Sequence, residues 1–369
     1  MRARACRVAR EDAGSYCGRI VDLPASVRRF VGGILAVRRK GWGEEPDAIC
    51  AEIRSNRRPF KIVLKTRNEG LLLRKWVEHH RRICGPQGLI IFDNGSTMPE
   101  VLAYLDEIAD DIPVYSYTWM HNFIHNRDKR FRLLYDALRA SSDYHLFLDT
   151  DEFLYWADEE GGYRDDATVA ERIVGTGQQA IPGIWAHNQP GQERHLRLTF
   201  RKGRLEAGIR GGKPVLSSAV EVSGEICHNS QVPKDLFRGA SVGNVIIAHL
   251  RNFSAQQRIA ANVEKISSYN RTTKILHTVG LTGEVLTLEE LLRVDDRRLG
   301  PGNARNYLAE IRLLTAGVGE ATSDGAGAVP IVIFADGRMT FANKRERQEI
   351  LAFLNDPAEV LAAALLAPR

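Results

Sequence analysis

Short apolar runs alternate with longer amphipathic segments over the first half of the chain, beginning at Phe60. The apolar runs have the length of buried strands, and they cover residues 60–64, 89–92, 113–117 and 144–148. Between them, apolar side chains recur three and four residues apart, which is typical of helices, at residues 72–83, 99–108 and 126–140. Strands that alternate with helices predict an α/β fold with a mostly parallel sheet flanked by helices.

The pattern changes after Gly161, where loops rich in glycine, proline and charge separate the apolar runs. Further strands are predicted at residues 180–188 and 242–250, and helices at residues 254–278, 288–293 and 304–315. A hairpin turned at Asp336-Gly337 is predicted at residues 330–342, followed by a helix at residues 344–366. The C-terminal part is therefore expected to be an α+β appendage that is mostly helical, with residues 316–327 as a linker.

The segment before the first strand differs from the rest in charge. Residues 1–60 hold 13 Lys and Arg against 7 Asp and Glu, whereas the remainder holds 38 against 39. A near-neutral body does not have the basic surface of a nucleic-acid-binding protein, so we expect no nucleic-acid partner. Helices are predicted at residues 24–40 and 47–56, so the division expected is a basic helical extension at 1–58, an α/β domain at 59–253 and a mostly helical region at 254–369.

The basic extension has two interpretations. Its apolar stretch at residues 31–37 is far shorter than the ~20 residues that a membrane span needs, and no signal-peptidase pattern follows it. It is either an amphipathic helix in weak contact with an anionic membrane surface or, as we favour, a helix packed on the protein. In either case residues 1–58 are expected to be dispensable for the chemistry of the α/β domain.

Cysteine usage bears on the compartment. The five cysteines form no C-x-x-C pair and their number is odd, which favours a reducing compartment over a disulfide framework or a zinc site. We therefore expect a cytoplasmic protein, peripheral to the membrane only if the extension binds lipid.

Candidate chemistry lies at the end of the strand predicted at 144–148. Asp149, Asp151 and Glu152 place three carboxylates within four residues, directly after a buried strand. Their mutual repulsion has no reason in packing, but a hard divalent cation such as Mg²⁺ or Mn²⁺ would offset it. The alternative is a solvated acidic turn. By contrast, His79 and His80 lie within a predicted helix, away from the strand ends where sites form, and are expected to be structural.

Two other predicted strands also end in polar motifs. Asn68-Glu69-Gly70 follows the first strand, and residues 93–97, Asp-Asn-Gly-Ser-Thr, follow the second. Together with Asp149-Thr150-Asp151-Glu152-Phe153, this order of motifs resembles the GT-A glycosyltransferases, in the family-2-like and family-92-like branch. The resemblance covers roughly residues 61–250 and implies a GT-A-like, Rossmann-like fold.

The resemblance implies an activity and its cofactor. It implies a metal-dependent glycosyltransferase that moves a sugar from a nucleotide-sugar donor, expected to be a UDP-sugar, to a hydroxyl of a carbohydrate or glycoconjugate acceptor, with inversion. The cofactor would be Mn²⁺ or Mg²⁺, which as a Lewis acid neutralises charge on the leaving phosphate.

The resemblance also implies residue roles. Asp149 and Asp151 would serve the metal, with Asp149 also near the donor, and a downstream histidine would complete the site. His228, which ends a strand-like run with polar residues, is favoured over His249, which lies in an apolar run where a core histidine is expected. Asp93 would bind the nucleobase. The nucleotide pocket would be lined by Thr66, Arg67, Asn68, Glu69 and Asn94.

Three further site residues are weaker candidates. Arg127, at the start of a predicted helix, would reach the diphosphate, or else form an ion pair on the helix face. Lys213 lies in a glycine-rich loop that would close over the donor. Glu193 is the preferred general base for the acceptor hydroxyl, ahead of Glu221 and Glu225.

Two other function classes remain open from sequence. A nucleotidyltransferase acting on a sugar phosphate can share the sheet and the metal, although residues 66–70 contain one glycine and an acid where such enzymes usually have a glycine-rich basic loop. A catalytically inactive GT-A-like binding module is the other class, and the intact Asp93, Asp149 and Asp151 argue against it.

Overall fold

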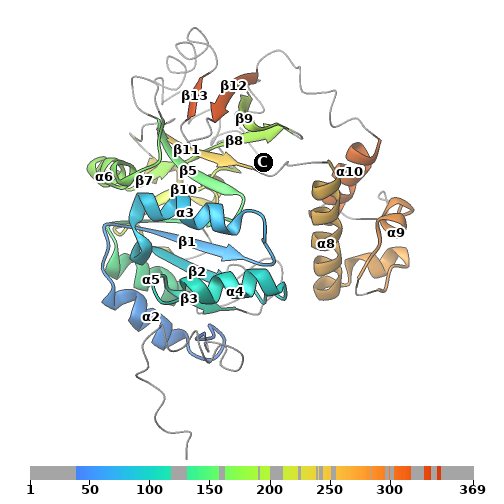
Figure 1. The fold of residues 1–369 in the computed structure, drawn as a ribbon, viewed down its shortest axis with the longest axis horizontal. Coiled ribbons are helices and arrows are strands. Elements are labelled where there is room, and N and C mark those ends of the chain that lie inside the picture. Colours follow the sequence, from blue (N-terminus) through green and yellow to red (C-terminus); the bar gives the residue numbers. More distant parts are fainter. Residues whose placement is uncertain are drawn as a thin grey trace, which may run out of the picture. The chain divides into compact units, whose positions relative to one another are not determined.

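A computed structural model of the chain describes its central part (Figure 1). The described residues are 39–117, 131–157, 163–189, 192–199, 211–222, 226–237, 240, 244–250, 255–283, 285–295, 299, 303–316, 328–333 and 339–341, and the side chains of 187–199 and of 328–341 are not among them. Contacts divide the chain into two units, residues 1–39 and residues 40–369, and the second unit contains the helices and strands described here. None of the helices in the described ranges is long and apolar enough to cross a membrane.

The first sheet is mixed and mostly parallel, as the sequence predicts. Its strand order is β3-β2-β1-β4-β10-β7. The four parallel strands are β1 (Phe60–Thr66), β2 (Leu89–Asp93), β3 (Val114–Ser116) and β4 (Tyr144–Asp149). Two antiparallel strands extend it beyond β4: β10 (Pro214–Ser217) and β7 (Ala180–Pro182). The α/β fold class with helices flanking the sheet is therefore confirmed.

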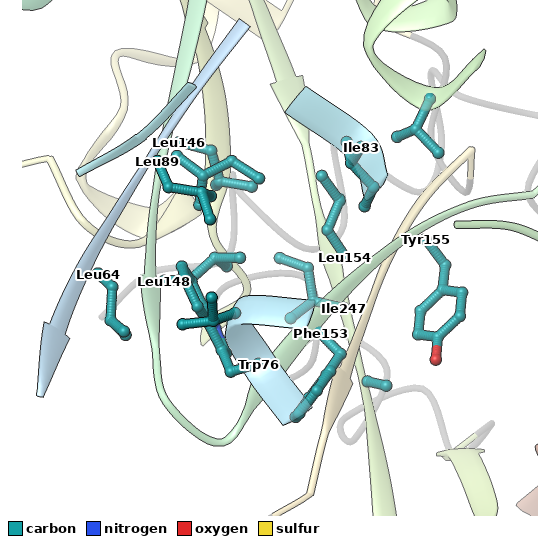
Figure 2. Packing of buried hydrophobic residues seen from close by; sticks show 14 of the residues in the cluster. Leu64, Trp76, Ile83, Leu89, Leu146, Leu148, Phe153, Leu154, Tyr155 and Ile247 are labelled. Carbon is teal, nitrogen blue, oxygen red and sulfur yellow. The ribbon is translucent and has the colours of Figure 1, made fainter. Parts of the chain in front are cut away.

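Helices cover both faces of this sheet, which is why its strands are apolar on both sides. On one face, α3 (Leu73–Cys84) and α4 (Pro99–Ile108) pack in a cluster with Ile62 and Leu64 of β1. On the other, α2 (Pro46–Ser55) and α5 (Phe131–Ser141) pack in a cluster with Val63. Figure 2 shows part of the first cluster, to which Trp76 of α3, Leu148 and Phe153 all belong.

The chain passes from the first sheet into a second one at the acidic motif. β4 ends at Asp149, and β5 (Glu152–Ala157) begins after only Thr150 and Asp151. The second sheet has the order β13-β12-β9-β8-β11-β5-β6. Its other strands are β6 (Tyr163–Arg164), β8 (Ile184–Gln189), β9 (Gln192–Thr199), β11 (Val245–His249), β12 (Ala328–Ile333) and β13 (Met339–Phe341). The acidic motif thus lies at the junction of two sheets.

Two buried histidines hold α3 against β5. His79 Nε2 lies 2.8 Å from the carbonyl of Leu154, and His80 Nε2 accepts a hydrogen bond from the Leu154 amide at 3.2 Å. Burial lowers the pKa of His79 to about 4, so the ring is neutral at physiological pH. The prediction that both histidines are structural agrees with these contacts.

The C-terminal helices have a core of their own. α8 (Ala255–Thr273), α9 (Leu288–Leu292) and α10 (Asn303–Thr315) surround a cluster that includes Ile266, Leu291 and Ile311. The helix predicted at 254–278 is interrupted, because Lys274 adopts a left-handed conformation with φ 53° and a 3₁₀ helix (Ile275–Val279) follows. Another helix, α6 (Ala167–Gly175), lies between β6 and β7 in the chain.

Most predicted elements agree with the structure in position. β12 and β13 pair as the predicted antiparallel hairpin, although the turn at residues 336–337 lies outside the described residues. The helix predicted at 344–366 also lies outside the described residues. So does the linker predicted at 316–327, apart from residue 316, and so does the helix predicted at 24–40, apart from residues 39 and 40, which are not helical. The linker sequence precedes β12, which pairs with β9, so the hairpin belongs to the second sheet.

The helix predicted at 47–56 is part of the core and not of a separable extension. α2 buries Ile49 and Ile53, and just before it Trp42 is fully buried with its ring edge-on to Phe92 at 5.8 Å. Lys61 of β1 also donates a hydrogen bond to the carbonyl of Ile53 at 2.8 Å. The boundary of the larger unit is therefore at residue 40, earlier than the expected boundary at 58.

Two truncations test this boundary. Removing residues 1–39 is expected to leave the melting temperature unchanged. Removing residues 1–58 also deletes the buried side chains of Trp42, Ile49 and Ile53 and exposes the apolar surface that they cover. Since burying each such side chain contributes ~1.5–3 kcal/mol, the longer truncation should lower the melting temperature by ~10 °C or more. Differential scanning calorimetry of both variants makes the measurement, and equal melting temperatures would show that α2 is dispensable after all.

Candidate active site

Strand register brings the three polar motifs to one edge of the first sheet. β1 pairs with β4 so that Lys65 lies beside Asp149, and with β2 so that Thr66 lies beside Asp93. These pairs are the last of each ladder, at the carboxyl ends of parallel strands, where α/β proteins bind ligands. The residues that the sequence singles out after three different strands therefore meet at one place.

Glu152 braces the acidic motif from inside. Its side chain is fully buried, and its Oε2 accepts a hydrogen bond from the backbone amide of Asp149 at 2.8 Å. Its Oε1 accepts a hydrogen bond from Nε1 of Trp185, on β8, at 2.8 Å. A carboxylate that accepts two such bonds in the interior fixes the turn between the sheets, so the alternative of a solvated acidic turn is wrong for this residue.

Two lysines pair with Asp149. Lys213 Nζ lies 2.9 Å from Oδ2 of Asp149 and 3.5 Å from Oε2 of Glu152, and Lys65 Nζ lies 3.4 Å from Oδ1 of Asp149. Burial by itself would raise the pKa of Asp149, but the two ammonium groups outweigh it and hold that pKa well below its ordinary value. The side chain of Lys213 is only 3% exposed, while that of Lys65 is 30% exposed.

Lys213 does not have the position expected of a loop residue that closes over a donor. A side chain at Gly212 would meet the carbonyl of Gly183, and one at Gly211 would meet the ring of Trp185. The two glycines therefore allow close packing of the backbone that precedes Lys213. The expectation of a closing loop is corrected to a buried internal ion pair.

Asp151 has a histidine partner, and it is His249. Nε2 of His249 lies 3.2 Å from Oδ2 of Asp151, and the amide of Leu250 donates a hydrogen bond to the Asp151 carbonyl at 2.7 Å. β11 pairs with β5 so that His249 lies beside Glu152, which places the ring over the acidic motif. Burial by itself would raise the pKa of Asp151, but the interaction with His249 more than offsets it and lowers that pKa.

His228 lies nearby with a different partner. Its Nδ1 is 2.6 Å from the carbonyl of Gly211, and burial lowers its pKa to about 4. The ring of Trp185 lies between the two histidines, 5.6 Å from the His228 ring and 4.8 Å from the His249 ring, measured between centroids. The sequence favours His228 as the metal ligand and His249 as a core histidine, but the contacts are the reverse. His228 bonds a backbone carbonyl, and His249 faces the carboxylate of Asp151.

The residues present fit a divalent cation at the Asp151–His249 pair. Carboxylate oxygen and imidazole nitrogen are both ligands that Mn²⁺ accepts, and here they lie 3.2 Å apart at the carboxyl edge of the first sheet. Within the described ranges, no group of three or more His, Cys, Asp or Glu side chains is arranged to hold a metal ion. A cation that takes its remaining ligands from phosphate and water, as Mg²⁺ usually does, suits a site with few protein ligands.

The expected nucleotide-pocket residues are partly engaged with one another. Thr66 is buried and its hydroxyl accepts a hydrogen bond from the Thr150 hydroxyl at 3.1 Å. Asp93 is buried and its Oδ1 accepts a hydrogen bond from the Ser96 amide at 3.0 Å. The Asn94 amide donates to the Thr66 carbonyl at 2.8 Å, and Arg67 is half-buried.

Glu69 lies near the carboxylates of the acidic motif. Burial, with further contributions from the charges of Asp151 and Asp149, raises the pKa of Glu69 to about 7. A carboxyl group with such a pKa exchanges a proton readily near neutral pH. The sequence places Glu69 among nucleotide-pocket residues, and its electrostatic neighbours in the structure include the two aspartates and Lys265.

Four expected residues are not placed among these side chains. Arg127 and Glu225 lie outside the described residues. Glu193 belongs to β9, but its side chain is not described. The side chain of Glu221 is 83% exposed, with its carboxylate 3.9 Å from Arg139 of α5, so it is a surface residue.

Sequence analysis missed Trp185 as part of the site, and it set Lys65 aside in favour of its neighbour Thr66, because only one of two consecutive strand residues can face inward. Trp185 is one apolar residue of a predicted strand, and no local pattern indicates that its indole faces Glu152. Lys65 had a signal that was available, since pairing of two adjacent parallel strands by their apolar runs places it beside Asp149. The role of Glu152 as a brace follows from burial, which the sequence does not disclose.

Comparisons with known proteins identify no family for this chain. No protein-family model matches it. No curated protein matches it either.

Solved structures show remote similarity. Glucosyl-3-phosphoglycerate synthase from Mycobacterium tuberculosis with Mg²⁺ and UDP is 16% identical, over 60% of this chain and 82% of that one, with a TM-score of 0.31. S. aureus TarS 1–349 is 10% identical, over 77% and 97%, with a TM-score of 0.28. Mannosyltransferase PcManGT from Pyrobaculum calidifontis with GDP-Man and Mn²⁺ is 12% identical, over 85% and 86%, with a TM-score of 0.30. Because all three TM-scores are below 0.5, we draw nothing from these similarities.

Proposed function

We propose that this protein is a metal-dependent glycosyltransferase that transfers a sugar from a nucleotide-sugar donor to an acceptor hydroxyl. The observation that carries the proposal is the Asp151–His249 pair at the carboxyl edge of a parallel sheet, the same edge at which β2, two strands away from β4, ends in Asp93. One end of this edge suits a cation and the other suits a nucleotide, and a nucleotide sugar presents both a diphosphate and a base. We propose a UDP-sugar as the donor and Mn²⁺ or Mg²⁺ as the cation.

The charges of the site support this chemistry. A bound cation would act as a Lewis acid and neutralise the leaving diphosphate. Lys65, half-exposed beside Asp149, adds a second positive group at the same edge, where charge develops as the glycosidic bond breaks. On the buried side, Lys213 pairs with the carboxylate of Asp149 and Glu152 accepts a hydrogen bond from its backbone amide, so both hold Asp149 in place. Asp149 is thus proposed to shape the site and Asp151 to bind the metal.

The acceptor hydroxyl needs a general base in an inverting reaction. Glu193 remains our proposal from sequence. Glu69 is a second candidate, because its pKa of about 7 suits proton transfer near neutral pH and it lies near Asp151. A carbohydrate or glycoconjugate is the proposed acceptor.

Donor hydrolysis tests the proposed function. With Mn²⁺ present, we expect release of UDP from at least one member of a UDP-sugar panel and no release after EDTA treatment. Failure to cleave any nucleotide sugar, or full activity in EDTA, would contradict the proposal. Pyrophosphate release from UTP and a sugar phosphate would indicate a nucleotidyltransferase, and binding without turnover would indicate a binding module.

Asp93→Asn tests the nucleobase role. Asparagine keeps an oxygen that can accept the Ser96 amide bond but loses the second carboxylate oxygen and the charge. We expect the dissociation constant for UDP to rise by ~10- to 100-fold, which is the range for a hydrogen bond to a charged group. Calorimetric titration with UDP makes the measurement, and an unchanged dissociation constant would place Asp93 outside the pocket.

A further inference from the structure

Asn68 has an unusual backbone conformation at the end of β1. Its φ is +54°, and among the non-glycine residues of the described ranges only Lys274 shares a positive φ. Left-handed backbone costs roughly 1–2 kcal/mol for most side chains, and asparagine tolerates it better than others. Contacts made by the residue must therefore stabilise this conformation.

Four hydrogen bonds join Asn68 to the loop after β2. Its backbone amide donates to Oγ of Ser96 at 2.9 Å. Its Oδ1 accepts from the amides of Thr97 at 2.7 Å and Met98 at 3.1 Å, and its Nδ2 donates to Oγ1 of Thr97 at 3.3 Å. Since a carbonyl oxygen has two lone pairs, both acceptor positions of the Asn68 amide are used within the protein.

The same loop is joined to Asp93. Ser96, which accepts from the Asn68 amide, donates its own amide to Oδ1 of Asp93 at 3.0 Å. These bonds join Asn68, through its backbone amide and its side chain, to Ser96, Thr97 and Met98, and join Ser96 to the carboxylate of Asp93. We call this connected set of bonds the loop clasp, and the side chain of Asn68 supplies three of them. Asn68 is thus linked, through the loop after β2, to Asp93, the residue proposed to bind the nucleobase.

We propose that Asn68 is a positioning residue that locks the loops after β1 and β2 together, and that it sets the nucleotide pocket through the loop clasp and not by contact with the ligand. This inference rests on the proposed function for its ligand, a uridine diphosphate. It replaces the expectation from sequence that Asn68 lines the pocket.

Two substitutions separate positioning from contact. Asn68→Gly accepts the left-handed backbone but removes the three side-chain hydrogen bonds. Asn68→Asp keeps an oxygen that can accept from Thr97 and Met98, tolerates positive φ, and loses the Nδ2 donor. The pair thus holds the backbone conformation constant while the clasp is broken or kept.

Two readouts are measured for each variant, namely hydrogen exchange of the Thr97 and Met98 amides and the dissociation constant for UDP. For Asn68→Gly we expect exchange at both amides to rise by at least ~10-fold, in line with the loss of bonds of about 1 kcal/mol each. We expect UDP binding to weaken by ~10-fold, with KM for the donor rising more than kcat falls. For Asn68→Asp we expect both quantities to stay within about threefold of the wild type.

The outcomes that overturn the inference are distinct. Weaker UDP binding by Asn68→Asp with unchanged amide exchange would show that this side chain acts on the ligand directly, through the lost Nδ2 donor or the added negative charge, and not through the loop clasp. Faster exchange in Asn68→Gly with unchanged UDP binding would show that the clasp does not set the pocket. Hydrogen exchange needs no nucleotide, so unchanged exchange in Asn68→Gly would refute the clasp by itself. Absence of UDP binding by the wild type would instead refute the proposed donor, and faster exchange would still establish the clasp.

Discussion

Asp151→Asn is expected to lower metal-dependent donor cleavage by at least ~10²-fold, the scale of losing a key electrostatic group. The substitution keeps the size of the side chain and removes the negative charge that faces His249 at 3.2 Å. Because Asp151 is partly exposed at the edge of the sheet and Glu152 braces the turn, the fold should be retained. Activity close to wild type would contradict the proposed metal site.

The two histidines provide a matched comparison for the same site. His249→Ala should raise the Mn²⁺ concentration needed for half-maximal activity and weaken Mn²⁺ binding measured by calorimetry. His228→Ala, which loses a bond to the Gly211 carbonyl, a ring contact with Trp185 and an electrostatic interaction with Asp149, should leave the Mn²⁺ requirement unchanged. The reverse pattern would return the ligand role to His228, as the sequence favours. Both variants share the neighbour Trp185, so effects through that ring are common to them.

Lys213→Met is expected to destabilise the protein by ~3–5 kcal/mol, which is the scale of breaking a buried ion pair by removing one partner. Methionine keeps most of the volume of the lysine stem, so the lost term is the ammonium between Asp149 and Glu152. Both carboxylates would then remain in the interior with less compensation. Equilibrium denaturation in urea at pH 7 measures the difference in unfolding free energy.

The effect of Lys213→Met should depend on pH. In the wild type the pKa of Asp149 is depressed on folding, so its contribution to stability is present above the ordinary pKa of an aspartate and is lost as the pH falls through the folded value. The variant lacks most of that contribution. The difference between the two proteins should therefore be close to constant from pH 7 down to about pH 4, the ordinary pKa of an aspartate, and become smaller at lower pH, as the carboxyl groups are protonated. A difference that does not change with pH would mean that packing, not charge, is the cause.

Lys61→Met is the control for burying and removing a lysine. Lys61 is also buried, but its ammonium donates to the neutral Ile53 carbonyl at 2.8 Å and the Ser141 hydroxyl at 2.7 Å. Burial lowers its pKa to about 8, which shows that the charge is not well compensated there. Loss of these bonds, offset by relief of that burial, should cost at most about 2 kcal/mol. Equal destabilisation by both variants would refute a special role for the Lys213 ion pair.

The order of strands and helices between residues 60 and 149 was predictable because the signal is local. A strand buried on both faces is a short apolar run, and a helix with one buried face has apolar residues three and four apart. Alternation of the two requires crossover connections and thus parallel strands, which placed the polar residues after β1, β2 and β4 on one edge. The start of α4 is an exception: its N-cap is Met98, and the amide of the preceding Thr97 donates a hydrogen bond to Asn68. The partner of that amide is 29 residues away, beyond any local pattern.

The division of the chain was less predictable for the same reason. Whether α2 is an appendage depends on whether its apolar face has a partner, and that partner is α5, far along the chain. In the same way, the sequence assigns the hairpin of β12 and β13 to an appendage, whereas the pairing of β12 with β9 makes it part of the second sheet. An edge strand gains its backbone partners only from tertiary structure.

The sequence by itself determined the α/β alternation, the strand ends at which a site would form, and the carboxylates that a cation would need. Tertiary structure alone decided the partners of those carboxylates. His249 meets Asp151 across 98 residues, Lys213 meets Asp149 across 64, and Trp185 meets Glu152 across 33. The physical reason is that a strand's own pattern specifies which side chains are buried, whereas the charge or hydrogen-bond partner that makes burial tolerable is supplied by whichever strand the fold places alongside.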